Sequence, residues 1–174
     1  MSWFSNSFYL IERFIYSGGP VLLGIGLLLL LLWILMIERG FYLFVHFPIY
    51  QKQMLQQWLA RDDKTSWYAL QIRQGKLAQA SMRLKQNMDF LNALITMFPL
   101  LGLLGTVSGM IQVFDVVAVH GTGNPRLLAS GISLATIPTM AGLVCALSGL
   151  FIYSRLQSHA KKLHAQLALK LVSK

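Results

Sequence analysis

Three long runs without a charged residue dominate the pattern of apolar and polar positions. They extend over Phe14–Ile37, Phe90–Phe114 and Leu127–Ser154. Each reaches or exceeds the roughly 20 residues that a helix needs to cross a bilayer. A soluble helix of this length would carry a polar stripe on one side, and the first run has none. The pattern therefore predicts an all-α integral membrane protein with transmembrane helices at 14–37, 90–118 and 127–154.

The segments between these runs predict the rest of the architecture. Residues 1–13 are rich in aromatic side chains and are expected to lie on the membrane surface as an amphipathic segment. Residues 38–89 lack the apolar content of a globular domain and are expected to form long helical extensions. Within them, "RDDKTSW" is the expected turn or helix start, with Asp62, Asp63 or Thr65 as the cap. Gly, Asn and Pro predict a tight turn at 119–126. Residues 155–174 carry leucines at helical spacings and continue the third helix.

The distribution of basic residues predicts the orientation. The segment between the first two helices holds eight of them, the C-terminal tail five, the N-terminus one and the remaining loop one. Basic residues favour the cytoplasmic side. The N-terminus is therefore expected outside, and residues 38–89 and the C-terminus are expected in the cytoplasm.

Composition narrows the chemistry. The net charge is +9, yet only 12% of the residues are charged, against about 25% in an ordinary soluble domain. The basic excess therefore indicates topology and attraction to anionic lipid, and nucleic acid is not a predicted partner. Cys145 lies in an apolar run, and the four histidines show no metal-ligand grouping. No catalytic pattern appears, so neither an enzyme activity nor a cofactor is expected.

Small residues form a stripe on each of the last two apolar helices. At 3.6 residues per turn, the first stripe falls within about 100° and the second within about 80°. The first consists of Gly102, Gly105, Thr106 and Gly109; the second consists of Gly131, Ala135, Thr139, Gly142, Ala146 and Gly149.

Two interpretations of the stripes remain open. Small residues allow close helix–helix packing, which alone would explain the glycines. Alternatively, the two threonines line a cavity or contact another polar helix. A single three-helix chain would not use both stripes fully, which favours self-association into a ring. The central turns of the three helices contain no Asp, Glu, Lys, Arg or His, so a proton carrier would have to come from a partner.

The order of motifs resembles the MotA/TolQ/ExbB proton-channel family. The resemblance rests on "PLLGLLGTVSGMIQVF", the Gly/Asn/Pro turn, "GISLATIPTMAGLVCALSGLFIY" and "IERG" at the end of the first helix. Within the family the chain looks most like the ExbB branch. This implies a homopentamer in the bacterial inner membrane that encloses the transmembrane helices of an ExbD-type dimer. Residues 1–13 and 119–126 would then be periplasmic.

The resemblance also implies roles for particular residues. Thr106 and Thr139 match the family's pore threonines, and Glu38 and Arg39 match the acidic-basic pair after the first helix. The chain departs from the best-known members at Leu134, where they have a glutamate. That difference weakens any mechanism that needs a carboxylate on this subunit.

The expected function is that of a motor subunit. With ExbD- and TonB-type partners, it would use the proton-motive force to energise outer-membrane uptake of iron–siderophores, haem or vitamin B12. Two alternatives stay open. One is a TolQ-like subunit that serves envelope integrity, and the other is a passive scaffold or ion pore.

Overall fold

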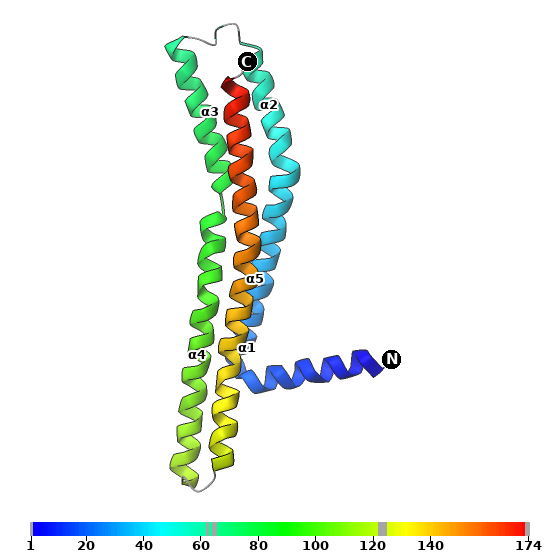
Figure 1. The fold of residues 1–174 in the computed structure, drawn as a ribbon, viewed down its shortest axis with the longest axis vertical. Helices are drawn as coiled ribbons and strands as arrows, with labels where there is room; N and C mark the ends of the chain where they lie inside the picture. Colours follow the sequence, from blue (N-terminus) through cyan, green and yellow to red (C-terminus); the bar gives the residue numbers. More distant parts are fainter. Residues whose placement is uncertain (1, 62, 64–65, 122–124, 173–174) are drawn as a thin grey trace. The chain divides into compact units, whose positions relative to one another are not determined.

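The computed structural model describes residues 2–61, 63, 66–121 and 125–172, and every element in these ranges is helical. The elements are α1 (Ser2–Phe41), the π-helical turn η1 (Tyr42–His46), α2 (Phe47–Leu59), α3 (Trp67–Lys85), α4 (Met88–His120) and α5 (Pro125–Val172) (Figure 1). Three helical stretches are long and apolar enough to cross a membrane. The predicted all-helical fold with three long apolar helices is therefore confirmed.

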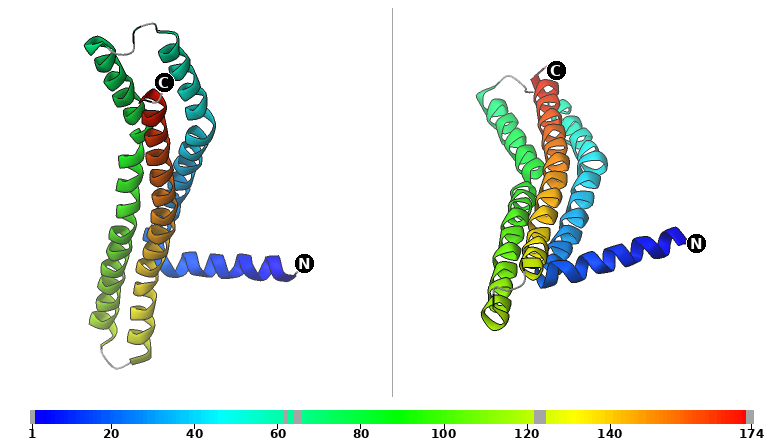
Figure 2. Two further views of the ribbon diagram at one scale, coloured as in Figure 1. Left: turned by 45° about the horizontal axis from the view of Figure 1, so that its top comes forward. Right: turned by 60° about the horizontal axis from the view of Figure 1, so that its bottom comes forward.

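The helix α1 contains a sharp turn at Gly19. Its φ of 64° and ψ of −165° lie outside the helical region. Only glycine adopts such a conformation readily, and the following Pro20 disfavours a helical residue before it. In both figures the first part of α1 leads away from the part after Gly19 (Figures 1 and 2). This turn falls inside the predicted span 14–37.

The π-helical turn η1 continues α1 directly into α2. Its last hydrogen bond runs from the backbone N–H of Phe47 to the carbonyl oxygen of Tyr42, five residues earlier. Pro48 follows, and proline has no N–H to offer the carbonyl of Phe44. A local change of hydrogen-bond register before this proline keeps the helix continuous.

The start of α3 differs from the prediction. Ser66 is the cap, and its side chain accepts a hydrogen bond from the Ala69 N–H at 3.1 Å. The expected cap Asp63 instead accepts from the Ser66 N–H at 3.0 Å. The other two expected caps, Asp62 and Thr65, lie outside the described residues.

Between α3 and α4 the chain leaves the helical conformation for two residues. Gln86 is extended, with φ −49° and ψ 134°, and Asn87 has a φ of 61°. Asparagine adopts this left-handed conformation more readily than most residues. The Asn87 carbonyl accepts the first hydrogen bond of α4, from the Leu91 N–H at 3.0 Å. The two residues therefore end one helix and begin the next.

The chain divides into two compact units. The first comprises Met1–Leu32 and Ala93–Gly149. Its core is formed by aliphatic side chains and one phenylalanine from α1, α4 and α5. Its buried residues include Leu22, Ile25, Leu32, Leu94, Ile95, Phe98, Val113, Ala135 and Ala146.

The second unit comprises Trp33–Asn92 and Leu150–Lys174. In it, α5 runs between α2 and α3 (Figures 1 and 2). The helix buries a stripe with spacings of three and four residues, which places the buried residues on one face of the helix. The buried residues of this stripe are Leu156, Ala160, Leu163, Leu167 and Leu171. The C-terminal segment thus continues the third apolar helix, as its leucine spacing predicts.

Candidate functional site

The small-residue stripes of α4 and α5 meet each other within one chain. A Cβ atom added to Gly102 would lie 2.9 Å from the Thr139 Cα atom. One added to Gly142 would lie 2.5 Å from the carbonyl oxygen of Phe98. Both obstacles are backbone atoms, so neither can move aside without separating the helices. The two glycines therefore allow the backbones of α4 and α5 to touch.

The close contact continues along both helices. A Cβ atom on Gly109 would lie 2.6 Å from the Cβ atom of Ala135, and one on Gly131 would lie 2.5 Å from a methyl group of Val113. Gly105 faces the ring of Pro138 in the same way. The expectation that a single chain cannot use both stripes is wrong on this point. The stripes are paired within the subunit and do not by themselves require a second copy.

The last residues of the α5 stripe bring in the third helix of the first unit. A Cβ atom on Gly149 would lie 3.0 Å from a Leu32 methyl group of α1 and 3.1 Å from Ile95 of α4. Ala146 is buried one turn earlier. The three apolar helices thus pack tightly at this level.

The two threonines make different hydrogen bonds. The Thr139 hydroxyl crosses from α5 to α4 and donates to the Gly102 carbonyl oxygen at 2.9 Å. The Thr106 hydroxyl donates within its own helix to the Leu103 carbonyl oxygen at 2.7 Å. Since each hydroxyl uses its proton as donor, its oxygen keeps lone pairs that can accept a hydrogen bond. Thr139 thus contacts α4 one turn before Thr106.

Leu134 lies outside this helix contact. Its neighbour Ala135 is buried against Gly109, whereas Leu134 itself is exposed. Leu134, where the resemblance leads us to expect a glutamate, therefore lies outside the close α4–α5 contact.

In the second unit, Arg39 occupies a buried position at the end of α3. Only 5% of its surface is exposed. Its Nη2 atom donates to the carbonyl oxygens of both Arg83 and Leu84, at 2.6 Å each. Cations are favourable at this end of a helix, where carbonyls lack helical partners. Arg39 therefore caps α3, a partnership that the sequence spacing gave no means of predicting.

The surroundings of Arg39 act on the pKa of its guanidinium in opposite directions. Desolvation by burial lowers the pKa of its guanidinium, while the neighbouring Tyr42 and Glu38 act in the opposite direction. The guanidinium also lies over the Tyr42 ring, with Cζ 4.9 Å from the ring centroid. Glu38, in contrast, is exposed. The acidic-basic pair therefore has one buried and one accessible member.

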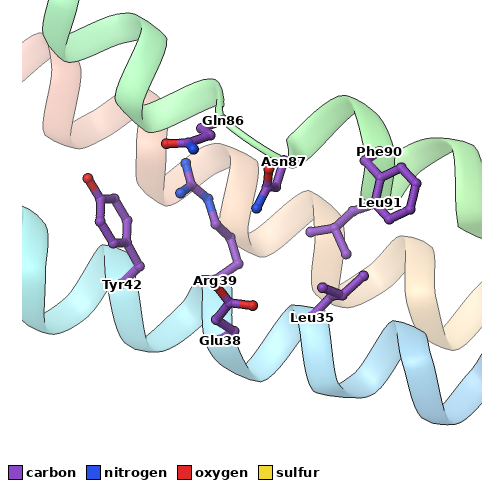
Figure 3. A pocket seen from close by; sticks show the side chains of 8 residues that line it. All are labelled: Leu35, Glu38, Arg39, Tyr42, Gln86, Asn87, Phe90 and Leu91. Carbon is purple, nitrogen blue, oxygen red and sulfur yellow. The ribbon is translucent and has the colours of Figure 1, made fainter.

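A pocket of about 200 Å³ opens beside this pair (Figure 3). The residues that line it belong to α1, η1, the α3–α4 connection and the first turn of α4. They are Leu35, Glu38, Arg39, Tyr42, Gln86, Asn87, Phe90 and Leu91. Sequence reasoning did not find this pocket, because it depends on the two-residue interruption between α3 and α4.

Comparison with known proteins identifies the family to which the chain belongs. The model of the MotA/TolQ/ExbB proton channel family matches residues 46–168, more than half of the chain. The chain belongs to the MotA/TolQ/ExbB proton channel family. Its three long apolar helices and this membership make it a multi-pass membrane protein.

Two curated relatives carry ExbB names. The chain is 38% identical over 79 residues to "Putative biopolymer transport protein ExbB-like 1" of Synechocystis sp., covering 44% of this chain and 31% of the relative. It is 51% identical over 49 residues to "Biopolymer transport protein exbB1" of Vibrio cholerae, covering 28% of this chain and 22% of the relative. Each match thus spans less than a third of the relative's length. The resemblance to ExbB-type proteins is confirmed.

Some of the candidate residues lie within the range that matches the MotA/TolQ/ExbB family, and others lie before it. Both threonines and both small-residue stripes lie within the matched residues 46–168, whereas Glu38 and Arg39 precede them. The α4–α5 contact is therefore part of the family region.

Proposed function

We propose that this chain is an ExbB-type subunit of a proton-driven motor in a bacterial inner membrane. With ExbD- and TonB-type partners, it energises active transport across the outer membrane, such as the uptake of iron–siderophores, haem or vitamin B12. The observation that carries the proposal is the family match over residues 46–168, which contains both threonines. The ExbB names of the two relatives favour this branch of the family.

The mechanism assigns the titrating group to the partner. The apolar stretches 14–37, 90–114 and 127–154 contain no acidic, basic or histidine side chain. An ExbD-type helix would present its aspartate beside Thr106 and Thr139. The Thr139 hydroxyl already donates to the Gly102 carbonyl, so its oxygen is oriented to accept from a protonated carboxyl or from water. Moving one charge through 100 mV releases about 2.3 kcal/mol, and several protons would drive a sizeable movement.

The motor requires several copies around the partner, and we propose a ring of five. Large apolar side chains are exposed on α4 and α5 of the single chain, among them Leu104, Val107, Leu143 and Leu147. Such surfaces are covered in a membrane by lipid or by other helices. The proposed ring uses part of them for neighbouring copies and for the partner. The N-terminus then lies in the periplasm and the C-terminus in the cytoplasm, in agreement with the basic residues.

The partner that co-purifies tests this proposal. Affinity-purified chain from native membranes should bring down a protein with one transmembrane helix and an intramembrane aspartate, together with a TonB-type protein. Deletion of the gene should abolish receptor-dependent uptake, and a protonophore should abolish that uptake in the wild type.

The same experiment separates the alternatives. Recovery of envelope-integrity proteins, with normal uptake in the deletion strain, would identify a TolQ-like subunit. Activity that persists unchanged in the presence of the protonophore would identify a passive scaffold or pore.

A further inference from the structure

The pocket beside Arg39 changes in polarity from one end to the other. Leu35, Phe90 and Leu91 form its apolar end (Figure 3). Leu35 lies within the apolar stretch 14–37, and Phe90 and Leu91 lie within the apolar stretch 90–114. Glu38, Arg39, Tyr42, Gln86 and Asn87 form the polar end. A phospholipid has the same order of groups along its length at a membrane surface.

Arg39 brings a buried positive charge to the wall of this pocket. Its Nη2 atom is occupied by the α3 carbonyls, but its Nε–H is buried and has no hydrogen-bond partner among the described residues. A phosphate group in the pocket would compensate the buried guanidinium charge.

Further donors converge from the α3–α4 connection. The side-chain amides of Gln86 and Asn87 line the pocket, and Figure 3 shows both near Arg39. Helix α4 begins at Met88, so the first N–H groups of the helix have no partner inside it. Helix N-termini of this kind favour phosphate groups. The guanidinium and the amides thus provide donors for one anion.

Glu38 limits what that anion can be. Its exposed carboxylate lines the same pocket, so it repels a ligand that carries only negative charge. A ligand with a phosphate and an adjacent ammonium group fits both charges. The volume of about 200 Å³ corresponds to six or seven water molecules at about 30 Å³ each, which suits a headgroup rather than a whole lipid.

We propose that this pocket binds the headgroup of a phospholipid of the phosphatidylethanolamine type. Arg39 and the Gln86 and Asn87 amides hold the phosphate, and Glu38 pairs with the ammonium group. The acyl chains leave past Leu35 and Phe90. The bound lipid would add to the hydrogen bonds by which Arg39 already joins the end of α1 to the end of α3. This inference uses the membrane residence of the chain and does not depend on the proposed motor.

Lipid retention by the purified full-length chain tests the proposal. The delipidated protein in detergent is mixed with equal amounts of phosphatidylethanolamine and phosphatidylglycerol, and bound lipid is counted by native mass spectrometry. The wild type should retain phosphatidylethanolamine preferentially. Millimolar inorganic phosphate should not displace it, since phosphate lacks the apolar part that contacts Leu35 and Phe90.

Two variants address the polar end. Asn87→Gly removes the amide while keeping a residue that accepts a positive φ, and it should lower phosphatidylethanolamine retention about fivefold. Glu38→Gln should lower the preference for phosphatidylethanolamine over phosphatidylglycerol by about threefold. The matched controls are Asn92→Ala and Asp89→Asn, which change exposed residues of α4 that do not line the pocket. Both controls should retain lipid as the wild type does.

Three results would overturn the proposal. The first is equal retention by Asn87→Gly and Asn92→Ala. The second is equal retention of both lipids by the wild type, which removes the role of Glu38. The third is displacement of the lipid by inorganic phosphate, which would make the pocket a general phosphate site. Helical circular dichroism of each variant accompanies the measurement, and neither pocket variant alters a buried side chain.

Discussion

At the scale of single residues, Thr139 and Thr106 make different hydrogen bonds. Only the Thr139 hydroxyl joins two helices, through its bond to the Gly102 carbonyl. Valine has nearly the same shape as threonine but lacks the hydroxyl. A change in function with little change in stability would therefore distinguish a proton-pathway role from packing.

We expect Thr139→Val to abolish or sharply reduce energised uptake while the assembled complex is still recovered. The lost hydrogen bond should cost the fold only about 1 kcal/mol. Thr139→Ser keeps the hydroxyl and should restore most of the uptake. Growth on limiting iron and thermal unfolding of the purified complex provide the two measurements.

Thr106→Val should reduce uptake without any measurable loss of stability, because its hydroxyl bonds only within α4. The double variant with valine at both positions tests whether either hydroxyl is needed for uptake. Normal iron-dependent growth of that strain would return both residues to a packing role.

At the scale of the elements, glycine substitutions test the α4–α5 contact. Gly109→Ala places its Cβ atom 2.8 Å from the Ala135 Cα atom, so the helices must separate. We expect a destabilisation of about 1–3 kcal/mol, as in other overpacked contacts. Gly26→Ala in α1 is the matched control, because nothing lies within 4 Å of the added atom. It should be neutral or slightly stabilising, since alanine is the better helix former. Equal melting temperatures of the two variants in detergent would contradict the close contact.

The end of α3 depends on one side chain from another element. Arg39→Met keeps the length of the side chain but leaves the Arg83 and Leu84 carbonyls without their donor. We expect a loss of about 1.5–3 kcal/mol, the usual worth of a hydrogen bond to a charged group. Hydrogen exchange should quicken at the C-terminal turn of α3 and stay unchanged at its N-terminal turn, where Ser66 is the cap. Uniform exchange along α3 in both proteins would exclude the capping role.

The sequence predicts the elements far better than their junctions. Long uncharged runs determine the three apolar helices, because burial of backbone polar groups in lipid leaves few alternatives to a helix. The junctions depend on single residues. The turn at Gly19, the π-helical turn before Pro48 and the interruption at Gln86–Asn87 each arise from local backbone preferences that the apolar pattern does not contain.

The candidate site shows the same division. The stripes on α4 and α5 were evident from the spacing of small residues, but their pairing with each other required the structure. Helical periodicity indicates which residues share a face and not which face opposes it. The bond from Thr139 to Gly102 and the cap from Arg39 to α3 join residues 37 and 44 or 45 positions apart, so no local pattern could indicate them.

At the scale of the whole molecule, the proposed mechanism depends on where the titrating group lies. The three apolar stretches 14–37, 90–114 and 127–154 carry no charged residue or histidine. Leu134, where the resemblance leads us to expect a glutamate, is exposed, whereas its neighbour Ala135 packs against Gly109. Proton relays within membranes generally need a titratable side chain, which is why the proposed mechanism assigns the carboxylate to the partner.

We expect liposomes that contain this chain alone to conduct few protons under an imposed potential. Addition of the ExbD-type partner should raise the flux, because the partner brings its aspartate. A partner with asparagine at that position should form the complex but leave the flux at the level of the chain alone. A pH-sensitive dye inside the vesicles measures all three preparations in parallel. Flux through the chain alone that equals the flux of the complete complex would place the pathway within this subunit and refute the division of roles between hydroxyls and carboxylate.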